Sequence, residues 1–590
     1  MTDNTSDRGR SDDHRQAPAD SPSESSPDGD DSRLPSRRQY LGLVAAATSA
    51  LGGCGGGGGG TSVSTTPGAS TADGTRTSGD NEISEHGIEF DRVLDAVDDL
   101  GLDSTGVSPV NDRLEEALTE GTLVRFPEGE YLFDESVALT APRIGVLGEE
   151  EVTFRPADGF NGLLFDGVTE GLDRVLIENV DIDIRAADTT AGIRLACARQ
   201  FHVQDVEFLG RGLTHNSGQV SAFLLSIREE GGRGVLRNAV AKKGSRIDGY
   251  AGGNGRIGIW VGWANKGTVR IENCDFREFG NNGTYTSRTP GQVEVVNSYF
   301  LNNNASNVRI GGEGSYVENC TVEIDMEKYT GPLSENPKSL NTRGIVVEQG
   351  VQLKGAEPIP AGAEIRDCTV LARSSPLSQA AIEQSPQARS LLIRDTDIQC
   401  DIDGTPAVRR GPPGTLQYRP ERRRPPPPLW TRLRNVTIDG SAAGRAAIDL
   451  HGAPGSVIED CTVHAPGRDR DGILLTDSPR SSIRGGEIRA SGYPVVIEID
   501  PETPPDRRLL CLDTGSMLRQ FIDTTEADDL TDSPPLLQVL RRNETGGTVC
   551  LGLAADIDAQ LQSDALSEPI LIGIVGHESG VPLGLLLDED

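Results

Sequence analysis

The chain has 590 residues, with 90 acidic and 56 basic side chains and a formal net charge of −34. Because no basic stripe offsets the repulsion from phosphate groups, this balance excludes DNA and RNA as partners. The nine cysteines form no Cys-x-x-Cys pair and no cluster with histidine at metal-ligand spacing, so a zinc site is not expected.

The acidic composition is unusual because lysine is scarce. Only six of the 56 basic residues are lysine, so nearly all positive charge is carried by arginine. A carboxylate-rich, lysine-poor surface is typical of proteins from salt-loving organisms, and we therefore expect a halophilic protein. The alternative interpretation is that the charge only keeps the protein soluble.

The N-terminal segment predicts an export signal rather than a fold. Residues 1–33 are rich in Asp, Ser and Arg and poor in apolar residues, so we expect disorder there. The pair Arg37-Arg38 precedes the apolar run 41–51, which is too short for an ordinary membrane span. Paired arginines before such a run resemble the twin-arginine export signal, which carries folded proteins across the membrane.

A lipid attachment site is predicted where this run ends. Leu51-Gly52-Gly53-Cys54 resembles a lipobox, in which the cysteine receives lipid after cleavage. We interpret residues 34–54 as signal and lipobox, and residues 55–85 as a flexible tether. The expected location is the cell surface, on the outer face of the cytoplasmic membrane, with lipid on Cys54 as the membrane anchor.

Residues 86–150 predict an N-terminal cap. Apolar residues at helical spacing predict a helix over 88–100. A second helix is expected from Asn111 onward, with Asp112 and Glu115 as its capping pair.

Residues 123–133 then predict two short strands about a Pro-Glu-Gly turn. The order of a helix followed by V-x-F-P-x-G-x-Y resembles the start of the pectate-lyase-like superfamily. In that superfamily the segment caps the first open coil of a β-helix. Such a cap is physically required, because an open coil edge would pair with other chains.

One six-residue phrase recurs through the body of the chain. An apolar residue stands two positions before an Asn, Asp or, in the weakest copy, Gly, and small or apolar residues stand one and three positions after it. The copies are 177–182, 203–208, 271–276, 295–300, 317–322, 365–370, 393–398, 433–438, 458–463 and, more weakly, 483–488. Successive Asn or Asp positions are mostly about 22 to 35 residues apart, which is the period of a solenoid. The wider gap from Asn319 to Asp367 implies a missed coil or an inserted loop.

The phrase predicts a bent strand. Apolar alternation slips by one residue at the Asn or Asp, which would swap the strand's faces unless the chain bends there. Asn, Asp and Gly tolerate the left-handed backbone that such a bend needs. Residues 151–500 are therefore predicted to form an all-β, right-handed parallel β-helix, and residues 501–590 a small C-terminal cap. A leucine-rich repeat is the alternative, but its leucine framework is missing.

Cysteines occupy one inward position of this phrase. Cys274, Cys320, Cys368 and Cys461 are expected to be small buried fillers, and disulfides between them are not expected because neighbouring copies carry no cysteine. Cys511 and Cys550 lie outside the repeat, and their pairing stays open.

A second strand precedes each phrase and presents an outward column, because successive side chains in a strand alternate between faces. The predicted column is Arg194, Trp260, Tyr285, Arg309, Val346, Glu383, Asp449 and Leu474. Trp260, Tyr285 and Arg309 are expected on neighbouring coils, where aromatic faces stack on sugar rings and Arg pairs with uronate or sulfate groups. The alternative is that Trp260 packs under a neighbouring loop.

The function predicted from this surface is binding and cleavage of an acidic polysaccharide. A lyase needs a base and a cation beside a uronate carboxylate, and a hydrolase needs two carboxylates, for which Asp248 and Glu313 are the candidates. The predicted catalytic residues are Lys242, Arg246, Asp248, Tyr285 and Arg309. The predicted substrate-binding residues are Arg194, Trp260, Trp263, Asn282, Arg288 and Glu313. The alternative is a non-catalytic glycan-binding or cell-envelope module on the same fold.

The superfamily's catalytic motifs match poorly. Arg288-Thr289-Pro290 begins like the Arg-x-Pro-x-x-Arg motif of pectate lyases, but Val293 stands where the second Arg belongs. No cofactor is expected, and no cluster of carboxylates suggests a metal site, calcium included. His202 and the other scattered histidines are expected in surface or turn roles.

Overall fold

The computed structural model describes residues 83–213, 221–247, 255–332, 342–349, 362–414, 425–478 and 480–499, and, by their backbone alone, five short strands between Leu510 and Leu585. The predicted export signal, the tether and the lipidation residue Cys54 lie outside these residues, and so does the predicted catalytic residue Asp248. In the described part of the chain, no helix is long and apolar enough to cross a membrane.

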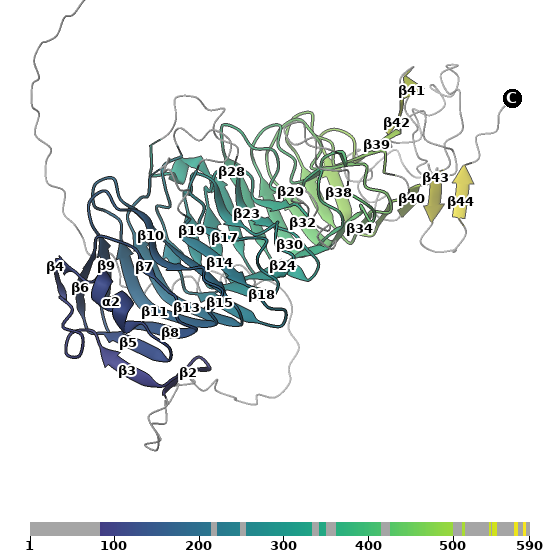
Figure 1. Cartoon of the computed structure of the whole chain (residues 1–590). Coiled ribbons are helices and arrows are strands. Elements are labelled where there is room, and N and C mark those ends of the chain that lie inside the picture. The colour runs from purple at the N-terminus through teal and green to yellow at the C-terminus, as the bar shows by residue number, and fades with distance from the viewer. Residues whose placement is uncertain are drawn as a thin grey trace, which may run out of the picture. The chain divides into compact units, whose positions relative to one another are not determined.

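The body is a stack of coils, each built from three strand segments in two sheets (Figure 1). One segment of every coil belongs to a 15-stranded sheet, called the front sheet here. Its strands are β7 (Val137–Ala138), β10 (Asn161–Gly167), β12 (Thr190–Cys197), β14 (Phe223–Ile227), β17 (Ile259–Val261), β20 (Asn282–Tyr285), β23 (Ser306–Ile310), β26 (Ile345–Val347), β29 (Ile382–Gln384), β31 (Val408–Arg410), β33 (Ile448–His451), β36 (Ile473–Thr476), β39 (Val495–Ile499), β41 (Arg542–Asn543) and β42 (Gly546–Cys550).

The other two segments of each coil form the two arms of a bent sheet. Strands of the first arm are β3 (Arg92–Asp95), β5 (Thr122–Phe126), β8 (Arg143–Gly148), β15 (Arg233–Arg237), β18 (Thr268–Glu272), β21 (Gln292–Val296), β24 (Ser315–Glu318), β27 (Ala363–Arg366), β34 (Val457–Glu459), β37 (Ser482–Arg484), β40 (Leu510–Asp513) and β43 (Ile572–Val575), the last paired with β44 (Pro582–Leu585). Strands of the second arm are β4 (Thr105–Pro109), β6 (Gly129–Phe133), β9 (Val152–Pro156), β16 (Val240–Ala241), β19 (Asp275–Arg277), β22 (Tyr299–Leu301), β25 (Thr321–Asp325), β28 (Thr369–Ser374), β35 (Thr462–Ala465) and β38 (Glu487–Ala490). Strands that run through both arms are β11 (Arg174–Asp183), β13 (Gln200–Leu209), β30 (Leu391–Cys400) and β32 (Thr431–Asp439).

Neighbouring coils pair in parallel and in register, so each coil templates the next. For example, β18 pairs with β21, β19 with β22, and β20 with β23. The inward side chains of all three segments pack into one continuous core that reaches from Ala96 to Ile497. The predicted right-handed parallel β-helix is confirmed by this arrangement.

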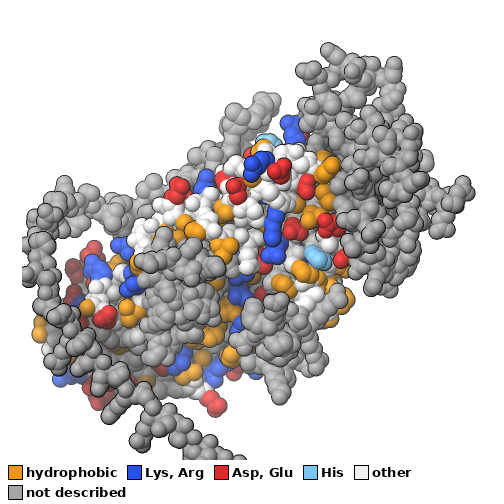
Figure 2. All heavy atoms as spheres, turned by 90° about the horizontal axis from the view of Figure 1, so that it is seen from above, with side chains coloured by type: hydrophobic (Ala, Val, Ile, Leu, Met, Phe, Trp, Pro, Cys, Tyr) orange, Lys and Arg blue, Asp and Glu red, His pale blue; other side chains and the backbone are white. Residues whose placement is uncertain are grey.

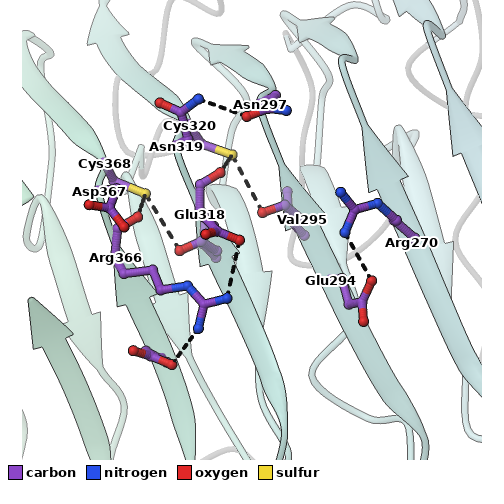
Figure 3. Close-up of polar contacts among 12 residues, drawn as sticks. Arg270, Glu294, Val295, Asn297, Glu318, Asn319, Cys320, Arg366, Asp367 and Cys368 are labelled. Atoms are coloured by element: carbon purple, nitrogen blue, oxygen red, sulfur yellow. Dashed lines mark hydrogen bonds and ion pairs between the residues drawn. The ribbon is translucent and has the colours of Figure 1, made fainter.

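The predicted bend is confirmed at every clear copy of the phrase. The Asn or Asp of these copies has a φ between 49° and 56°, as in Asn273 and Asp395. Asn238 holds the same conformation at φ 53° and marks a copy that the sequence pattern did not reveal. Side chains of successive bends can bond, and Figure 3 shows the Asn319 Nδ2 donating to the Asn297 Oδ1 at 2.7 Å. The bends therefore form a polar ladder along one edge of the stack.

The cysteines at the inward position are buried and free, as expected for fillers. Burial raises the pKa of the Cys274 thiol to about 12, so it stays a neutral thiol. The premise that neighbouring copies carry no cysteine is wrong, because Cys320 and Cys368 lie on adjacent coils (Figure 3). The long stretch of sequence between Cys320 and Cys368 is an insertion inside one coil, so no coil was missed between these two copies. Cys511 and Cys550 lie on β40 and β42 respectively, and their pairing stays open.

The N-terminal segment differs from its predicted form. The helix predicted over 88–100 is wrong: β2 (Ile88–Phe90) forms a hairpin with β1 (Ile83–Glu85), and β3 pairs in parallel with β5. Ile88 and Phe90 pack on Leu123 and Leu176 in a small cluster on the outer face of the bent sheet, so burial against the coils outweighs helical spacing.

The second predicted helix is confirmed as α2 (Asn111–Ala117). Its predicted capping pair is not formed, because the N-cap residue is Val110 and no side chain caps it. Glu115 instead accepts a hydrogen bond from the backbone N–H of Ala138 at 2.8 Å. The two predicted strands after it are confirmed as β5 and β6, which pair with the next coil in β8 and β9. A short 3-10 turn, η1 (Met326–Lys328), follows β25.

Candidate functional site

The predicted outward column exists as a continuous register across the front sheet. Its members in strand order are Asp166, Arg194, Leu224, Trp260, Tyr285, Arg309, Val346, Glu383, Arg409, Asp449 and Leu474. Trp260, Tyr285 and Arg309 stand on three neighbouring coils, as predicted. The sequence pattern missed Leu224 and Arg409. Leu224 belongs to the coil whose bend residue, Asn238, was not recognised. Arg409 belongs to a coil in which a long insertion separates the front-sheet strand from the next strand, which carries the bend residue Asn435.

Two aromatic rings lie side by side in this column. The Trp260 and Tyr285 rings are stacked, with centroids 6.5 Å apart and planes within 19° of parallel. Both side chains are half-buried. The structure thus has two stacked aromatic rings on two adjacent coils.

Two guanidinium groups hold the Tyr285 ring. The Arg309 Cζ lies 4.7 Å from the ring centroid, and the Arg288 Cζ lies 4.9 Å from it. Cations over an aromatic face are attracted by its quadrupole. Arg288 comes from the turn that follows β20, so a predicted binding residue joins the predicted column. Trp260, Tyr285, Arg288 and Arg309 are therefore brought together as one cluster, which we call the aromatic–arginine cluster.

A buried carboxylate orients Arg309. Glu348, at 1% exposure, accepts an ion-paired hydrogen bond from the Arg309 Nη2 and a hydrogen bond at 3.1 Å from the Ser287 Oγ. Because a buried charge must be paired, Glu348 fixes the guanidinium next to Tyr285. Sequence reasoning missed Glu348, since nothing local distinguishes it from other acidic residues after a strand.

The remaining predicted binding residues are dispersed. Arg194 lies two strands before Trp260. It forms an ion pair with Asp166 on the adjacent strand β10, with the Arg194 Nε 2.6 Å from the Asp166 Oδ1. Trp263 is 49% exposed in the turn after β17. Glu313 is exposed in the turn after β23.

The prediction for Asn282 needs correction. Its side chain is 1% exposed and donates to the Ser306 Oγ at 2.5 Å. Asn282 and Tyr285 are three residues apart, and strand alternation puts them on opposite faces. Asn282 therefore lies in the interior of the coil and does not face a ligand on the column.

Two predicted catalytic residues lie away from the cluster. Lys242 and Arg246 follow β16, in the turn that leads into the front sheet, whereas Arg288 and Glu313 lie in turns that leave it. The two sets of turns are at opposite ends of the front-sheet strands. Tyr285 and Arg309 are thus the predicted catalytic residues that the structure places together.

The column continues into a second charged group. Glu383, almost fully buried, bonds the Arg343 Nη1 at 2.6 Å and lies 3.7 Å from the Arg409 Nη1. Asp449 stands in register beside Arg409, and burial raises the pKa of its carboxyl, with Arg409 and Arg445 opposing the rise. Among the described residues, no group of three His, Cys, Asp or Glu side chains is arranged to hold a metal ion.

Comparisons with known proteins add only distant likenesses. No protein-family model and no curated protein matches the chain. Similar solved structures include PfbA, a surface adhesin of Streptococcus pneumoniae, at a TM-score of 0.41 and 13% identity over 78% of this chain and 99% of that chain. The A-module of a mannuronan C-5 epimerase of Azotobacter vinelandii gives a TM-score of 0.41 and 14% identity over 67% and 99%. The catalytic unit of an α-1,3-glucanase of Streptomyces thermodiastaticus gives 0.35 and 11% over 72% and 62%. At these values the likenesses carry no argument about activity.

Proposed function

We propose that the front-sheet face around the aromatic–arginine cluster binds an acidic polysaccharide. The observation that carries this proposal is the stacking of Trp260 on Tyr285 beside the guanidinium of Arg309. Aromatic faces offer an apolar surface to sugar rings, and a guanidinium fork pairs with a carboxylate or sulfate in two parallel bonds. A polymer with rings and acid groups in alternation fits both features.

The spacing of the cluster suits a chain rather than a single sugar. Adjacent strands lie about 4.8 Å apart, so Trp260 and Arg309, two strands apart, are separated by about 10 Å along the stack. The net charge of −34 repels any polyanion at long range. We therefore expect a polymer of lower charge density than a nucleic acid, held by local contacts with arginine.

The binding proposal is tested by replacing Trp260→Ala and measuring affinity for a panel of uronate and neutral polysaccharides by calorimetry. We expect at least a tenfold loss for the best acidic polymer, or about 1.4 kcal/mol. Trp430→Ala is the matched control, because Trp430 is also half-buried and also contacts an arginine, Arg432, but lies outside the front sheet. Equal affinity of the parent and the Trp260 variant would contradict the proposal.

A second candidate function is cleavage of the bound polymer by β-elimination. It is favoured by the two guanidinium groups that lie over the Tyr285 ring, with their Cζ atoms 4.7 Å (Arg309) and 4.9 Å (Arg288) from its centroid. In this reaction the phenolate form of Tyr285 takes the proton from the carbon beside the uronate carboxylate and becomes a phenol, and Arg309 neutralises that carboxylate. The glycosidic oxygen then leaves, takes a proton from water, and a carbon–carbon double bond remains.

Tyr285→Phe separates cleavage from binding, because it keeps the ring and removes only the hydroxyl. If the protein is a lyase, the ultraviolet absorbance of unsaturated product falls by about 100-fold or more in this variant while affinity is retained. Absence of product from the parent on every uronate polymer, with binding retained, would establish a binding module instead.

We also propose export by the twin-arginine route and lipid anchoring through Cys54, from the sequence motif alone. Replacing Arg37 and Arg38 with Lys should retain the protein inside the cell. Cys54→Ala should release it from the membrane fraction without changing binding. A Cys54→Ala protein that still sediments with membranes would contradict lipid anchoring.

A further inference from the structure

A cleft lies at the far part of the same column. It has a volume of about 580 Å³ and is lined by Ser375 to Gln379, Ile402 to Gly404, Arg409 and Arg445. Leu377 exposes 42% of its surface there. The cleft therefore combines an apolar side chain with hydroxyl, amide and guanidinium groups. It also holds one carboxylate, Asp403, which accepts a hydrogen bond from the backbone N–H of Ala443 at 2.8 Å, so two guanidinium groups face one acid group.

Polar groups of this cleft have capacity to spare. The Ser378 Oγ is buried and has no hydrogen-bond partner in the described part of the chain. Arg409 touches the carboxylate of Glu383 only at 3.7 Å, while Arg343 bonds that carboxylate at 2.6 Å. Arg343 is therefore the main ion-pair partner of Glu383, and the Arg409 guanidinium keeps N–H donors that can bond a further anion.

We propose that this cleft is a second subsite for an acid group of the same polysaccharide, which rests on the binding function proposed above. Arg409 lies three strands beyond Arg309 in the column register. At the strand spacing of a sheet, the two guanidinium groups are about 14 Å apart along the stack. Val346 and Glu383 between them are buried, so the polymer contacts the face at two points rather than along its whole length.

Two contact points on one ligand make affinity depend on chain length. Once an oligomer spans both subsites, the second contact is intramolecular and its effective concentration is high. Oligomers too short to span them gain nothing from the second subsite. The structure thus selects an acidic oligomer of several sugars over a disaccharide.

Asp449 adjusts this subsite to pH. Its carboxyl faces Arg409 and Arg445 from their own segments, His451 on its own strand, and Glu498 on β39, two strands further along the sheet. Because burial raises its pKa, Asp449 stays protonated to a higher pH than an ordinary carboxyl and repels a neighbouring anion less. As pH rises through that pKa, Asp449 ionises and the second contact weakens.

The test measures affinity for oligouronates of increasing length, from trimers upward, in the parent and in Arg445→Ala. Arg445 is exposed, so this variant leaves the core intact. We expect the parent to bind long oligomers more tightly than trimers, and Arg445→Ala to lose about tenfold for long oligomers and nothing for trimers. Arg434→Ala is the control, since it also removes one exposed guanidinium but from the bent sheet.

Different failures have different meanings. If trimers bind in a Trp260-dependent way but Arg445→Ala leaves the affinity for long oligomers unchanged, the second subsite is overturned and the binding function stands. If no oligomer of any length binds, the binding function itself fails. Asp449→Asn gives a further readout: its affinity for long oligomers should no longer fall as pH rises, and a variant that follows the parent's pH profile would overturn the role of Asp449.

Discussion

The bends of the bent sheet and the outward column of the front sheet belong to the same coils, but they differ in how much the residue type varies from coil to coil. Bends repeat Asn or Asp from coil to coil with nearly the same φ. The column changes from tryptophan to tyrosine to arginine within three coils. A backbone conformation restricts every bend in the same way, whereas each outward side chain is restricted only by its own neighbours, as Glu348 restricts Arg309. In a solenoid, uniform positions therefore report stability and variable positions report function.

The largest expected effect on stability is at the column residue Arg309, which is held by a buried ion pair. Glu348→Ala removes the carboxylate that pairs with Arg309 and leaves a largely buried guanidinium without it. The free energy of unfolding should fall by about 3 kcal/mol, as for other broken buried pairs. Denaturant titration measures this. Glu318→Ala, which breaks a more exposed pair with Arg366, should cost less than about 1 kcal/mol. Equal losses would mean that Glu348 does not anchor Arg309.

A bend substitution should have the next largest effect. Asn319→Val places a β-branched side chain at φ 50° and removes the bond to Asn297, so we expect a loss of about 2 kcal/mol. Asn319→Gly keeps the conformation accessible and should lose clearly less. Thermal unfolding of both variants compares them. A valine variant as stable as the glycine variant would show that backbone strain does not restrict the bends.

A smaller effect is expected on the outer face of the bent sheet, where the N-terminal hairpin docks. The His86 ring stacks on the His202 ring, with centroids 3.7 Å apart, and the His86 Nε2 lies 2.9 Å from the Glu178 Oε2. The bond to Glu178 raises the pKa of His86, and burial lowers the pKa of His202. Glu85, Gln204 and Arg237 also face the pair.

The signs of these shifts predict a bell-shaped pH dependence. The raised pKa of His86 gives stability that is present below its unfolded value and lost as pH rises through its folded pKa. The lowered pKa of His202 gives stability that is present above its unfolded value and lost as pH falls through its folded pKa. The protection factors of the hairpin amides, which correct the exchange rates for the intrinsic pH dependence of exchange, should be highest between the two pKa values. His202→Phe keeps a stacked ring and should abolish the loss on the acid side; an unchanged acid limb would contradict this assignment.

The smallest effect on stability is expected at Trp260. Trp260→Ala removes a half-buried outward side chain, and the free energy of unfolding should change by about 1 kcal/mol or less, although binding is lost. A loss as large as that of Asn319→Val would remove the distinction between the column and the bends. Denaturant titration alongside the binding measurement decides this.

Local features were predictable from sequence because each residue encodes them alone. The Asn and Asp bends, the inward cysteines and the alternation that places Trp260 outward all follow from backbone preference and strand period. Predictions failed where contacts between coils decide. The segment 88–100 became strands because the first coil offers an open edge to pair with. Asn282 is a different case, because strand alternation with Tyr285 outward already places it inward.

The sequence by itself thus determined a parallel β-helix and the adjacency of Trp260, Tyr285 and Arg309 in its column, but not the places of Leu224 and Arg409. Only the tertiary structure decided which residues meet across coils, because the length of chain between them varies with insertions. Glu348 reaches Arg309 across 39 residues, and Cys368 is the neighbour of Cys320 across an insertion of unforeseen length. Backbone preference is a property of one residue, whereas pairing depends on all the chain that lies between two residues.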